Sequence, residues 1–177
     1  RLLQIVLDNT QRINRIVQDV MQLNRRDRAQ PEVFELDAML RTFVEEFNLA
    51  ERPEPGVMAL AGMPDASISF DRGHLRQVLW NLCRNALRYG RKQAGSLMLS
   101  VNVAEGRVML EVRDDGPGLS AEHLGRLFEP FFTTASDGTG LGLYIAKELC
   151  EANGAQLEYH GQEEQTGDGG AGACFRI

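Results

Sequence analysis

Two asparagines and an arginine share one face of a stretch that reads as a single helix. At 100° per residue, Asn81, Asn85 and Arg88 fall on one arc, together with Gln77 and, at its far end, His74. An amide oxygen is a neutral, hard ligand that suits Mg²⁺, and a guanidinium offers a fork of donors to phosphate. Asparagine in the middle of a helix is less favourable than alanine by roughly 0.5 kcal/mol of helix stability. We therefore predict a Mg²⁺ and phosphate site on this face rather than a plain solvated surface, and we give His74 no part in it.

A carboxylate followed by two glycines comes after a predicted strand. Asp114 could accept a hydrogen bond from an exocyclic amine, which would select adenine over guanine. Gly116 and Gly118 would let the backbone approach a planar ring closely. The pattern differs from the dinucleotide-binding fingerprint, because no helix with the required glycine spacing opens directly from it. An ordinary Asp-Gly turn is the alternative interpretation.

A second glycine-rich stretch, Gly138 to Gly142, opens a predicted helix. Glycines free the backbone amides, and a helix N-terminus carries about half a positive charge, so a phosphate could bind there. The Gly-Lys-Ser/Thr of a P-loop is missing from this stretch, which makes it a different phosphate cradle. A flexible loop leading into a helix is the alternative.

The segment between the two glycine motifs has the composition of a lid. We expect Phe128, Phe131 and Phe132 to be largely buried and to fix its base, because three exposed aromatics would form a sticky patch. The small polar residues 133–137 carry no such anchor, so we expect them to move.

Composition indicates a globular protein of one ordinary domain and an appendage. The chain has 177 residues, 43% hydrophobic and 25% charged, and no apolar run approaches the roughly 20 residues that span a bilayer. Its net charge of −6 argues against nucleic-acid binding, so an anion such as ATP would need locally placed donors and a cation. We interpret Cys83, Cys150 and Cys174 as reduced, packed thiols, since their spacing fits no metal site.

The first 27 residues predict an amphipathic helix with an a/d seam. We expect the seam to pack against another helix or chain, and packing on its own domain is the alternative. Pro31 ends this helix, and the polar residues 28–31 form a linker. The expected domains are therefore 1–30 and 31–177. The seam residues are Leu2, Val6, Asn9, Ile13, Ile16, Val20 and Leu23.

Beyond the linker, the mixed order of strands and helices predicts an α+β fold in two layers. Asp37, Asp71 and Ser120 are expected to cap helices, and Glu105-Gly106 to turn a hairpin. The expected strands are 33–36, 57–63, 67–70, 97–103, 108–112, 157–160 and 174–177, and the expected helices are 37–48, 71–89, 120–127 and 140–153, with a turn at Pro64-Asp65 and a polar hairpin tip over 161–172.

Together these motifs resemble the N, G1, F and G2 boxes of the bacterial sensor histidine kinases. The resemblance covers residue 34 to the end, and the preceding helix resembles the second helix of their dimerisation and phosphotransfer hairpin. Within the family, the runs 131–134, 142–153 and 174–177 are most similar to the type IV pilus branch. The resemblance implies a mixed sheet covered on one face by helices, as in gyrase, Hsp90 and MutL. It also implies ATP and Mg²⁺ as ligands, and transfer of the γ-phosphate to a histidine.

The resemblance also implies roles for single residues and for partners. Asn81 and Arg88 would be catalytic, Asn85 would hold Mg²⁺ and Asp114 would bind the adenine amine. The partners would be the helix hairpin with the phosphoacceptor histidine, a response regulator and, in the full-length protein, a second copy. A cytoplasmic site and an inner-membrane anchor for the full-length protein are expected. The ATP-binding residues would be Asn81, Asn85, Arg88, Tyr89, Asp114, Gly116, Gly118, Leu119, Phe131, Thr133, Thr134, Gly138, Thr139, Gly140, Leu141, Gly142 and Leu143.

Two departures from the family pattern leave alternatives open. No His-Glu phosphoacceptor motif is present, so we expect no autophosphorylation by this chain alone. The lid residues 135–137 carry no Lys or Arg, which leaves the γ-phosphate to Arg88 or to a residue from elsewhere. Related ATPases place a glutamate base one turn before the Mg²⁺ asparagine, whereas Asn81 cannot take a proton from water. The alternatives are such an ATPase and a nucleotide-sensing scaffold without catalysis.

Overall fold

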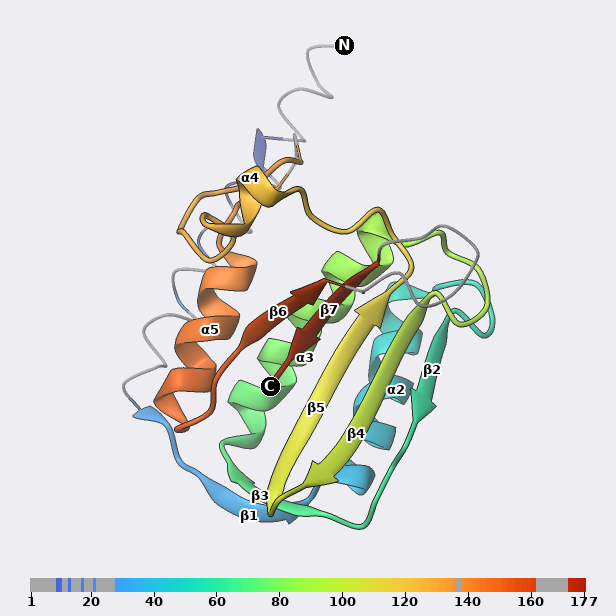
Figure 1. Ribbon diagram of the computed structural model, residues 1–177, viewed down its shortest axis with the longest axis vertical. Coiled ribbons are helices and arrows are strands. Elements are labelled where there is room, and N and C mark those ends of the chain that lie inside the picture. The colour runs from blue at the N-terminus through green and yellow to red at the C-terminus, as the bar shows by residue number, and fades with distance from the viewer. Residues whose placement is uncertain are drawn as a thin grey trace.

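The structure, a computed structural model, describes residues 9–10, 13, 17, 21, 28–135, 138–161 and 172–177 (Figure 1). The strands are β1 (Glu32–Glu35), β2 (Met58–Ala61), β3 (Ser67–Phe70), β4 (Leu97–Ala104), β5 (Arg107–Asp114), β6 (Glu158–Gly161) and β7 (Ala173–Arg176). The helices are α2 (Leu36–Glu51), α3 (Arg72–Tyr89), α4 (Ala121–Leu124) and α5 (Gly142–Ala152).

A five-stranded sheet in the order β2-β4-β5-β7-β6 forms the centre of the fold. β2 runs parallel to β4, and the other neighbouring strands are antiparallel. β1 and β3 form a separate antiparallel pair, so the Pro64-Asp65 connection leads from one sheet into the other instead of closing a hairpin. The expected hairpin at Glu105-Gly106 is confirmed, with both residues at positive φ (53° and 74°).

Helices α2 and α3 cover one face of the large sheet and lie behind it in Figure 1. Alternation along β4 sets this face: Leu97, Leu99 and Val101 are at most 4% exposed, whereas Asn102 on the other face is exposed. Burying each large aliphatic side chain stabilises the fold by about 1.5–3 kcal/mol. The two-layer α+β sandwich predicted from the sequence is confirmed.

Helix α3 lies at the centre of the core. Helical periodicity predicts an apolar arc opposite the polar one, made of Leu75, Leu79, Leu82, Cys83, Ala86 and Leu87. All of these residues are buried except Leu87, which is half-buried. The predicted polar arc is wrong at one end, because His74 is only 6% exposed. Its ring nitrogen Nδ1 lies 3.0 Å from Nδ2 of Asn153 at the end of α5, so it has the structural role expected for it.

Only one of the predicted N-caps forms. The Asp71 carboxylate accepts a hydrogen bond from the His74 amide at 3.0 Å. The prediction for Asp37 is wrong, because α2 already begins at Leu36, which is 1% exposed, and Asp37 pairs instead with Arg41 one turn later. Burial of Leu36 therefore sets the start of the helix without any side-chain cap.

The helices around the glycine motifs are shorter than predicted. Ser120 makes no capping bond; its hydroxyl lies 2.9 Å from His123 Nδ1, and α4 ends at Leu124. Helix α5 begins at Gly142 rather than at Gly140, because Gly140 has φ +72°, outside the helical region.

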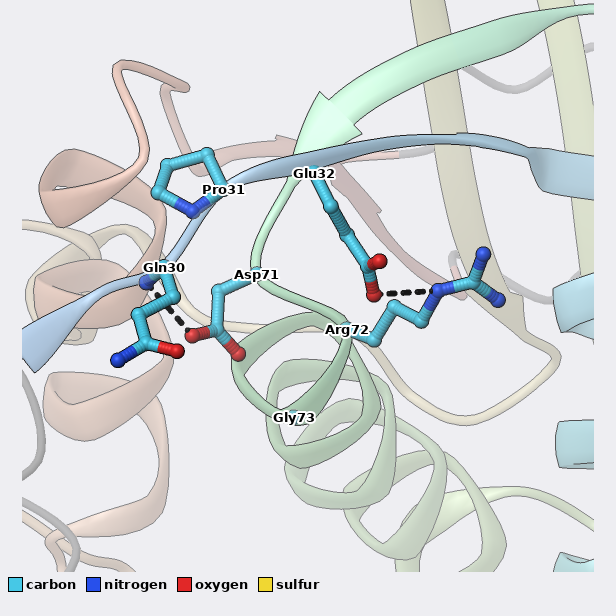
Figure 2. A pocket seen from close by; sticks show the side chains of 6 residues that line it. All are labelled: Gln30, Pro31, Glu32, Asp71, Arg72 and Gly73. Atoms are coloured by element: carbon cyan, nitrogen blue, oxygen red, sulfur yellow. Dashed lines mark hydrogen bonds and ion pairs between the residues drawn. The ribbon is translucent and has the colours of Figure 1, made fainter.

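The linker before β1 is attached to the body of the domain (Figure 2). The Gln30 amide donates to Asp71 Oδ2 at 2.9 Å, and Arg72 pairs with Glu32 at 2.6 Å. Asn153 Oδ1 in turn accepts from the Asp71 amide at 2.7 Å, so one aspartate joins the linker to α3 and α5. The predicted helix and seam over 1–27 lie largely outside the described residues; those described, Asn9, Thr10, Ile13, Val17 and Met21, are helical and exposed.

Two further findings concern the described part of the chain. None of its helices combines the length and the apolar character that crossing a membrane requires. Cys83, Cys150 and Cys174 are free and buried, as predicted. Burial raises the pKa of the Cys83 thiol, and burial with the nearby Glu151 charge raises the pKa of Cys150 to about 12. The predicted hairpin tip over 161–172 lies almost wholly outside the described residues.

Candidate functional site

The asparagine pair on α3 divides into two roles. Gln77 Nε2 donates to Asn81 Oδ1 at 3.2 Å, and Asn81 Nδ2 donates to the Gly142 carbonyl at 3.0 Å. Asn81 therefore ties α3 to the first residue of α5. The half-buried Asn85 amide has no hydrogen-bond partner among the residues that the structure describes. Its oxygen is thus available to a ligand on the same side of the helix.

Asp114 lies at the end of β5 and is 7% exposed. Its Oδ1 accepts from the Gly116 amide at 2.9 Å and from the Ala173 amide at 3.3 Å. Burial raises the pKa of the Asp114 carboxyl, these two bonds lower it, the Asp115 charge raises it, and the resulting shift is upward. With Oδ1 held by backbone amides, Oδ2 is the atom left for a ligand.

The glycines after Asp114 bring its loop against the last turn of α3. A Cβ on Gly116 would lie 2.6 Å from the Tyr89 carbonyl oxygen, so no other residue fits without movement. Gly118 has φ +68°, and the next amide, of Leu119, donates to the Tyr159 hydroxyl at 3.1 Å. The glycines after Asp114 thus allow the end of β5 to lie in close contact with the end of α3.

The second glycine motif holds the two ends of the lid together at Phe131 and Gly140, which we call the neck of the lid. The Phe131 amide donates to the Gly140 carbonyl at 2.9 Å, and a Cβ on Gly140 would overlap the Phe131 backbone. Phe131 itself has φ +65°, an uncommon conformation for a bulky side chain. Thr133 packs against Gly138, and its hydroxyl accepts from the Ala135 amide at 3.1 Å.

Helix α5 starts immediately after this neck. The Thr139 hydroxyl accepts a hydrogen bond from the backbone amide of the buried Leu141 at 3.3 Å. The helix begins at Gly142, and Leu143 is its second residue. The first amides of a helix have no intrahelical partner and carry partial positive charge. This end of α5 can therefore bind phosphate.

The aromatic base of the lid differs from its prediction. Phe128 and Phe132 are half-buried, but Phe131 is 68% exposed, so the expectation that all three are buried is wrong. The Arg126 guanidinium lies 4.6 Å from the Phe132 ring centre, and Lys147 Nζ lies 5.3 Å from that of Phe128. These cations cover the two inner rings, whereas the positive φ of Phe131 turns its side chain outward.

The structure brings together most of the predicted site residues and adds others. Asn81 meets Gly142, Tyr89 meets Gly116, and Phe131 meets Gly140. Among the described residues, the Leu119 amide bonds to Tyr159 rather than to another predicted site residue, and Ser136 and Asp137 of the lid lie outside them. Sequence reasoning missed Asp115, Ser96, Tyr159, Ala173 and Lys147; only Asp115, next to Asp114, carried a visible signal.

Two cavities are found in the described part of the chain, and the second includes Tyr159, the hydrogen-bond partner of Leu119. One, of about 440 Å³, is at the linker and is lined by Gln30, Pro31, Glu32, Asp71, Arg72 and Gly73 (Figure 2). The other, of about 410 Å³, lies between α4 and β6 and is lined by Leu124, Leu127, Phe128, Leu157, Glu158, Tyr159 and His160. Neither is lined by a residue predicted to bind ATP.

The donor set fits Mg²⁺ only together with a phosphate ligand. No group of three His, Cys, Asp or Glu side chains that could hold a metal occurs in the described part of the chain. Asn85 offers one neutral oxygen, and Mg²⁺ commonly takes few protein ligands and completes its shell with water and phosphate. The residues present therefore fit a metal that arrives with a nucleotide.

Comparison with known proteins places this arrangement in a family. Residues 70–177 match the family described as Histidine kinase-, DNA gyrase B-, and HSP90-like ATPase. The chain belongs to this family. The match covers α3, the end of β5, the lid and α5, which are the elements that carry the site.

Individual sensor kinases are similar over most or all of the chain. It is 42% identical to the sensor protein kinase PilS of Pseudomonas aeruginosa over all of this chain and 33% of that protein. Among solved structures, full-length ShkA in complex with AMPPNP has a TM-score of 0.72 at 30% identity, covering 90% of this chain and 34% of ShkA. Histidine kinase ThkA in complex with the response regulator TrrA has a TM-score of 0.76 at 22% identity, covering 99% of this chain and 49% of ThkA. At this identity the likeness shows a shared fold alone. The chain spans about a third of the length of the curated relatives it matches.

Proposed function

We propose that this chain is the ATP-binding catalytic part of a two-component sensor histidine kinase, and that it donates the γ-phosphate of ATP to a histidine on a helix hairpin. The observation that carries the proposal is the junction of α3, β5 and α5. The Asn81–Gly142 bond joins α3 to α5, and the Gly116–Tyr89 contact joins α3 to the end of β5. Three kinds of ligand group thereby meet at one place: a buried carboxylate, an amide oxygen and a helix N-terminus.

The chemistry of each group supports one part of a bound nucleotide. Asp114 Oδ2 accepts from the exocyclic amine of adenine, and the loop of Gly116 and Gly118 lies against the ring. Amides of Gly140, Gly142 and Leu143 donate to the phosphates. The guanidinium of Arg88 binds the terminal phosphate. Tyr89, Leu119, Phe131, Thr133, Thr134, Gly138, Thr139 and Leu141 line the same nucleotide.

Asn85 is the residue proposed to hold Mg²⁺. When bound, the metal neutralises charge on the phosphates and orients them for in-line attack. Asn81 supports Asn85 from one turn away and keeps the phosphate end of α5 against α3. This positioning is the catalytic contribution that we assign to Asn81.

The structure favours phosphate transfer over hydrolysis. An ATPase of the gyrase type needs a base near the attacking water. Both polar atoms of the Asn81 amide are engaged, with Gln77 and with Gly142, and an amide does not take up a proton. ATP would therefore persist until a histidine reaches it.

The partners follow from the same proposal. ThkA forms a complex with the response regulator TrrA, and we propose a response regulator as the downstream partner of this protein. We also propose the phosphoacceptor helix hairpin, a homodimer in the full-length protein, no nucleic acid, and a cytoplasmic site with an anchor in the inner membrane. By its resemblance to the pilus branch, the protein would act in type IV pilus regulation.

Phosphate transfer in trans tests this function. The chain is mixed with a separately purified helix hairpin that carries the acceptor histidine, and label from γ-³²P-ATP is followed. We expect acid-labile label on the hairpin that requires Asn85, and no stable label on the chain alone. Free phosphate without hairpin labelling would support an ATPase, and tight ATP binding without either product would support a nucleotide-sensing scaffold.

A further inference from the structure

The carboxylate next to Asp114 points to the loop that joins α3 to β4. Asp115 Oδ1 accepts from the Arg91 amide at 2.8 Å, and Oδ2 accepts from the Ser96 hydroxyl at 2.8 Å. The Asp115 amide donates to the Ser96 carbonyl at 3.2 Å, which adds one rung beyond the β4–β5 ladder. Both ends of the loop over 90–96 are thus fastened to one residue.

The partners of Asp115 make this attachment rigid. Ser96 is 3% exposed, and its hydroxyl also accepts from the Gln93 amide at 2.8 Å, so its donor is directed to Asp115. A Cβ on Gly90 would lie 3.2 Å from Asp115 Oδ1, so the chain leaving α3 passes directly over the carboxylate. By contrast, residues 91–95 of the loop are exposed.

This attachment spans the two walls of the proposed adenine site. One wall is the last turn of α3 with Asn85 and Tyr89, and the other is Asp114 with Gly116. Only a glycine fits at position 116, because a Cβ there would lie 2.6 Å from the Tyr89 carbonyl oxygen. A carboxylate bonded to the chain on both sides of that contact holds the walls at one separation.

We propose that Asp115 is a positioning residue that sets adenine selectivity, because it fixes where the Asp114 carboxylate stands relative to α3. The inference rests on the proposed function of Asp114. Asp115 does not itself touch the nucleotide in this proposal, since each of its carboxylate oxygens already has a protein donor. Ser96 acts through Asp115 in the same way.

Nucleotide competition tests the proposal on the whole chain. ATP and GTP affinities are measured with Mg²⁺ for the wild type, Asp115→Ala, Asp115→Asn and Ser96→Ala. In Asp115→Ala the Asp114 carboxylate is no longer held in place and loses its charge-assisted hydrogen bond to adenine. Such a bond corresponds to about tenfold in affinity, so this variant should weaken ATP binding by about tenfold and reduce the ATP/GTP ratio. Asp115→Asn keeps the shape and one acceptor oxygen, so it should retain the ratio, and Ser96→Ala should lower it partially.

Asp71→Ala provides the matched control for a purely structural effect. It removes the N-cap of the same helix far from the nucleotide, so it should lower the melting temperature and leave the ATP/GTP ratio unchanged. If Asp71→Ala lowers the ratio as much as Asp115→Ala does, or if folded Asp115→Ala keeps the wild-type ratio, the proposal is overturned. If Asp115→Ala fails to fold, an unchanged ratio in Ser96→Ala overturns it equally.

The pH dependence of ATP binding gives a second readout that a structural role would not move. The titratable groups facing Asp114 are Asp115 and the Tyr159 hydroxyl, whose pKa is raised by burial and also by the Asp114 charge. Asp115→Asn removes one negative charge, so Asp114 should protonate at lower pH and ATP binding should persist further into acid. Ser96→Ala should leave the pH at which ATP binding is lost unchanged. If this pH is the same in Asp115→Asn as in the wild type, the result counts against the proposal.

The roles of Asp114 and Asp115 can be tested separately. If the wild type binds ATP and GTP equally, the assignment of Asp114 falls, and this inference falls with it. If the wild type prefers ATP and Asp114→Asn removes the preference while Asp115→Ala retains it, only the role of Asp115 is wrong.

Discussion

At the residue scale, the polar side chains of α3 have different tasks despite their common face. Asn81 is held by Gln77 and Gly142, whereas the Asn85 amide has no hydrogen-bond partner within the described residues. A side chain bonded on both sides is suited to hold structure, and an unbonded half-buried amide is suited to a ligand. Chemical identity alone did not separate the two.

Asn85→Ala should largely abolish Mg²⁺-dependent ATP binding, because it removes the one protein oxygen proposed for the metal. Calorimetry with Mg²⁺-ATP, and again with EDTA, would measure the change. Asn102→Ala, on the exposed face of β4, is the control and should bind as the wild type does. Equal Mg²⁺-ATP affinities in Asn85→Ala and wild type would exclude Asn85 as the metal ligand.

Asp114→Asn should weaken ATP binding at least tenfold, since a charge-assisted hydrogen bond is worth about 1.5–3 kcal/mol. In the wild type, burial raises the pKa of Asp114, so its acceptor form is lost at a higher pH than for an ordinary carboxyl. ATP affinity should therefore fall as pH decreases through that raised pKa. Titration of binding from pH 8 to pH 4 tests both points, and a pH-independent affinity in the wild type would refute the assignment.

At the element scale, the lid neck depends on one close backbone approach. Gly140 and Gly154 have nearly the same φ, +72° and +71°, but only Gly140 would meet another chain segment, at Phe131. Gly140→Ala should therefore open the neck and weaken ATP binding by more than tenfold, a loss of roughly 1.4 kcal/mol or more.

Gly154→Ala is the matched control for the Gly140 prediction. Nothing lies within 4 Å of its Cβ position, so it carries only the backbone strain, of about 1–2 kcal/mol. The two variants should melt at lower temperature, but only Gly140→Ala should lose nucleotide. Equal nucleotide affinities would mean that the neck has no part in binding.

The elements that sequence predicted well are those with strong local patterns. The apolar arc of α3, its Asp71 cap and the Glu105-Gly106 hairpin all form as expected, because each is determined by residues close in the chain. The start of α2 was misplaced, since tertiary burial of Leu36 outweighed the capping preference of Asp37.

The site was harder to predict where its contacts join distant segments. Spacing indicated Asn81 and Asp114, but nothing local links Asn81 to Gly142 or Tyr159 to Leu119, which are 61 and 40 residues apart. The exposure of Phe131 was also missed, because composition alone cannot reveal its positive φ. The motifs thus indicate which residues form the site, but contacts between distant segments decide how those residues are placed.

At the scale of the whole molecule, a charged cluster on the open face of the sheet contributes to stability. Glu111 Oε1 accepts two bonds from Arg176, at 2.9 and 2.7 Å, and Oε2 accepts one from Arg113 at 2.7 Å. Burial alone would raise the pKa of Glu111, but the bond from Arg176 and the charges of Arg113 and Arg176 lower it below its ordinary value of 4.5. The cluster joins β5 to β7 across the sheet.

This cluster predicts acid sensitivity of folding. A lowered folded pKa means that Glu111 stabilises fully above the unfolded value, near 4.5, and that its contribution is lost as pH falls through the folded value. Glu111→Gln should reduce the unfolding free energy by about 1–3 kcal/mol at pH 7 and by much less at pH 3. Glu105→Gln in the exposed hairpin turn is the control. A constant difference from wild type at both pH values, measured by urea denaturation, would contradict the sign.

The central claim is that ATP binds where α3, the end of β5 and the start of α5 meet, and not in either of the two cavities. Chemical-shift mapping of the ¹⁵N-labelled chain with Mg²⁺ and AMPPNP tests it most directly. We predict the largest changes at the side-chain amide of Asn85 and at the backbone amides of Gly116, Gly140 and Gly142. Changes concentrated at Gln30, Glu32 and Gly73, or at Leu124 and Leu127, would locate the nucleotide in a cavity and contradict this placement.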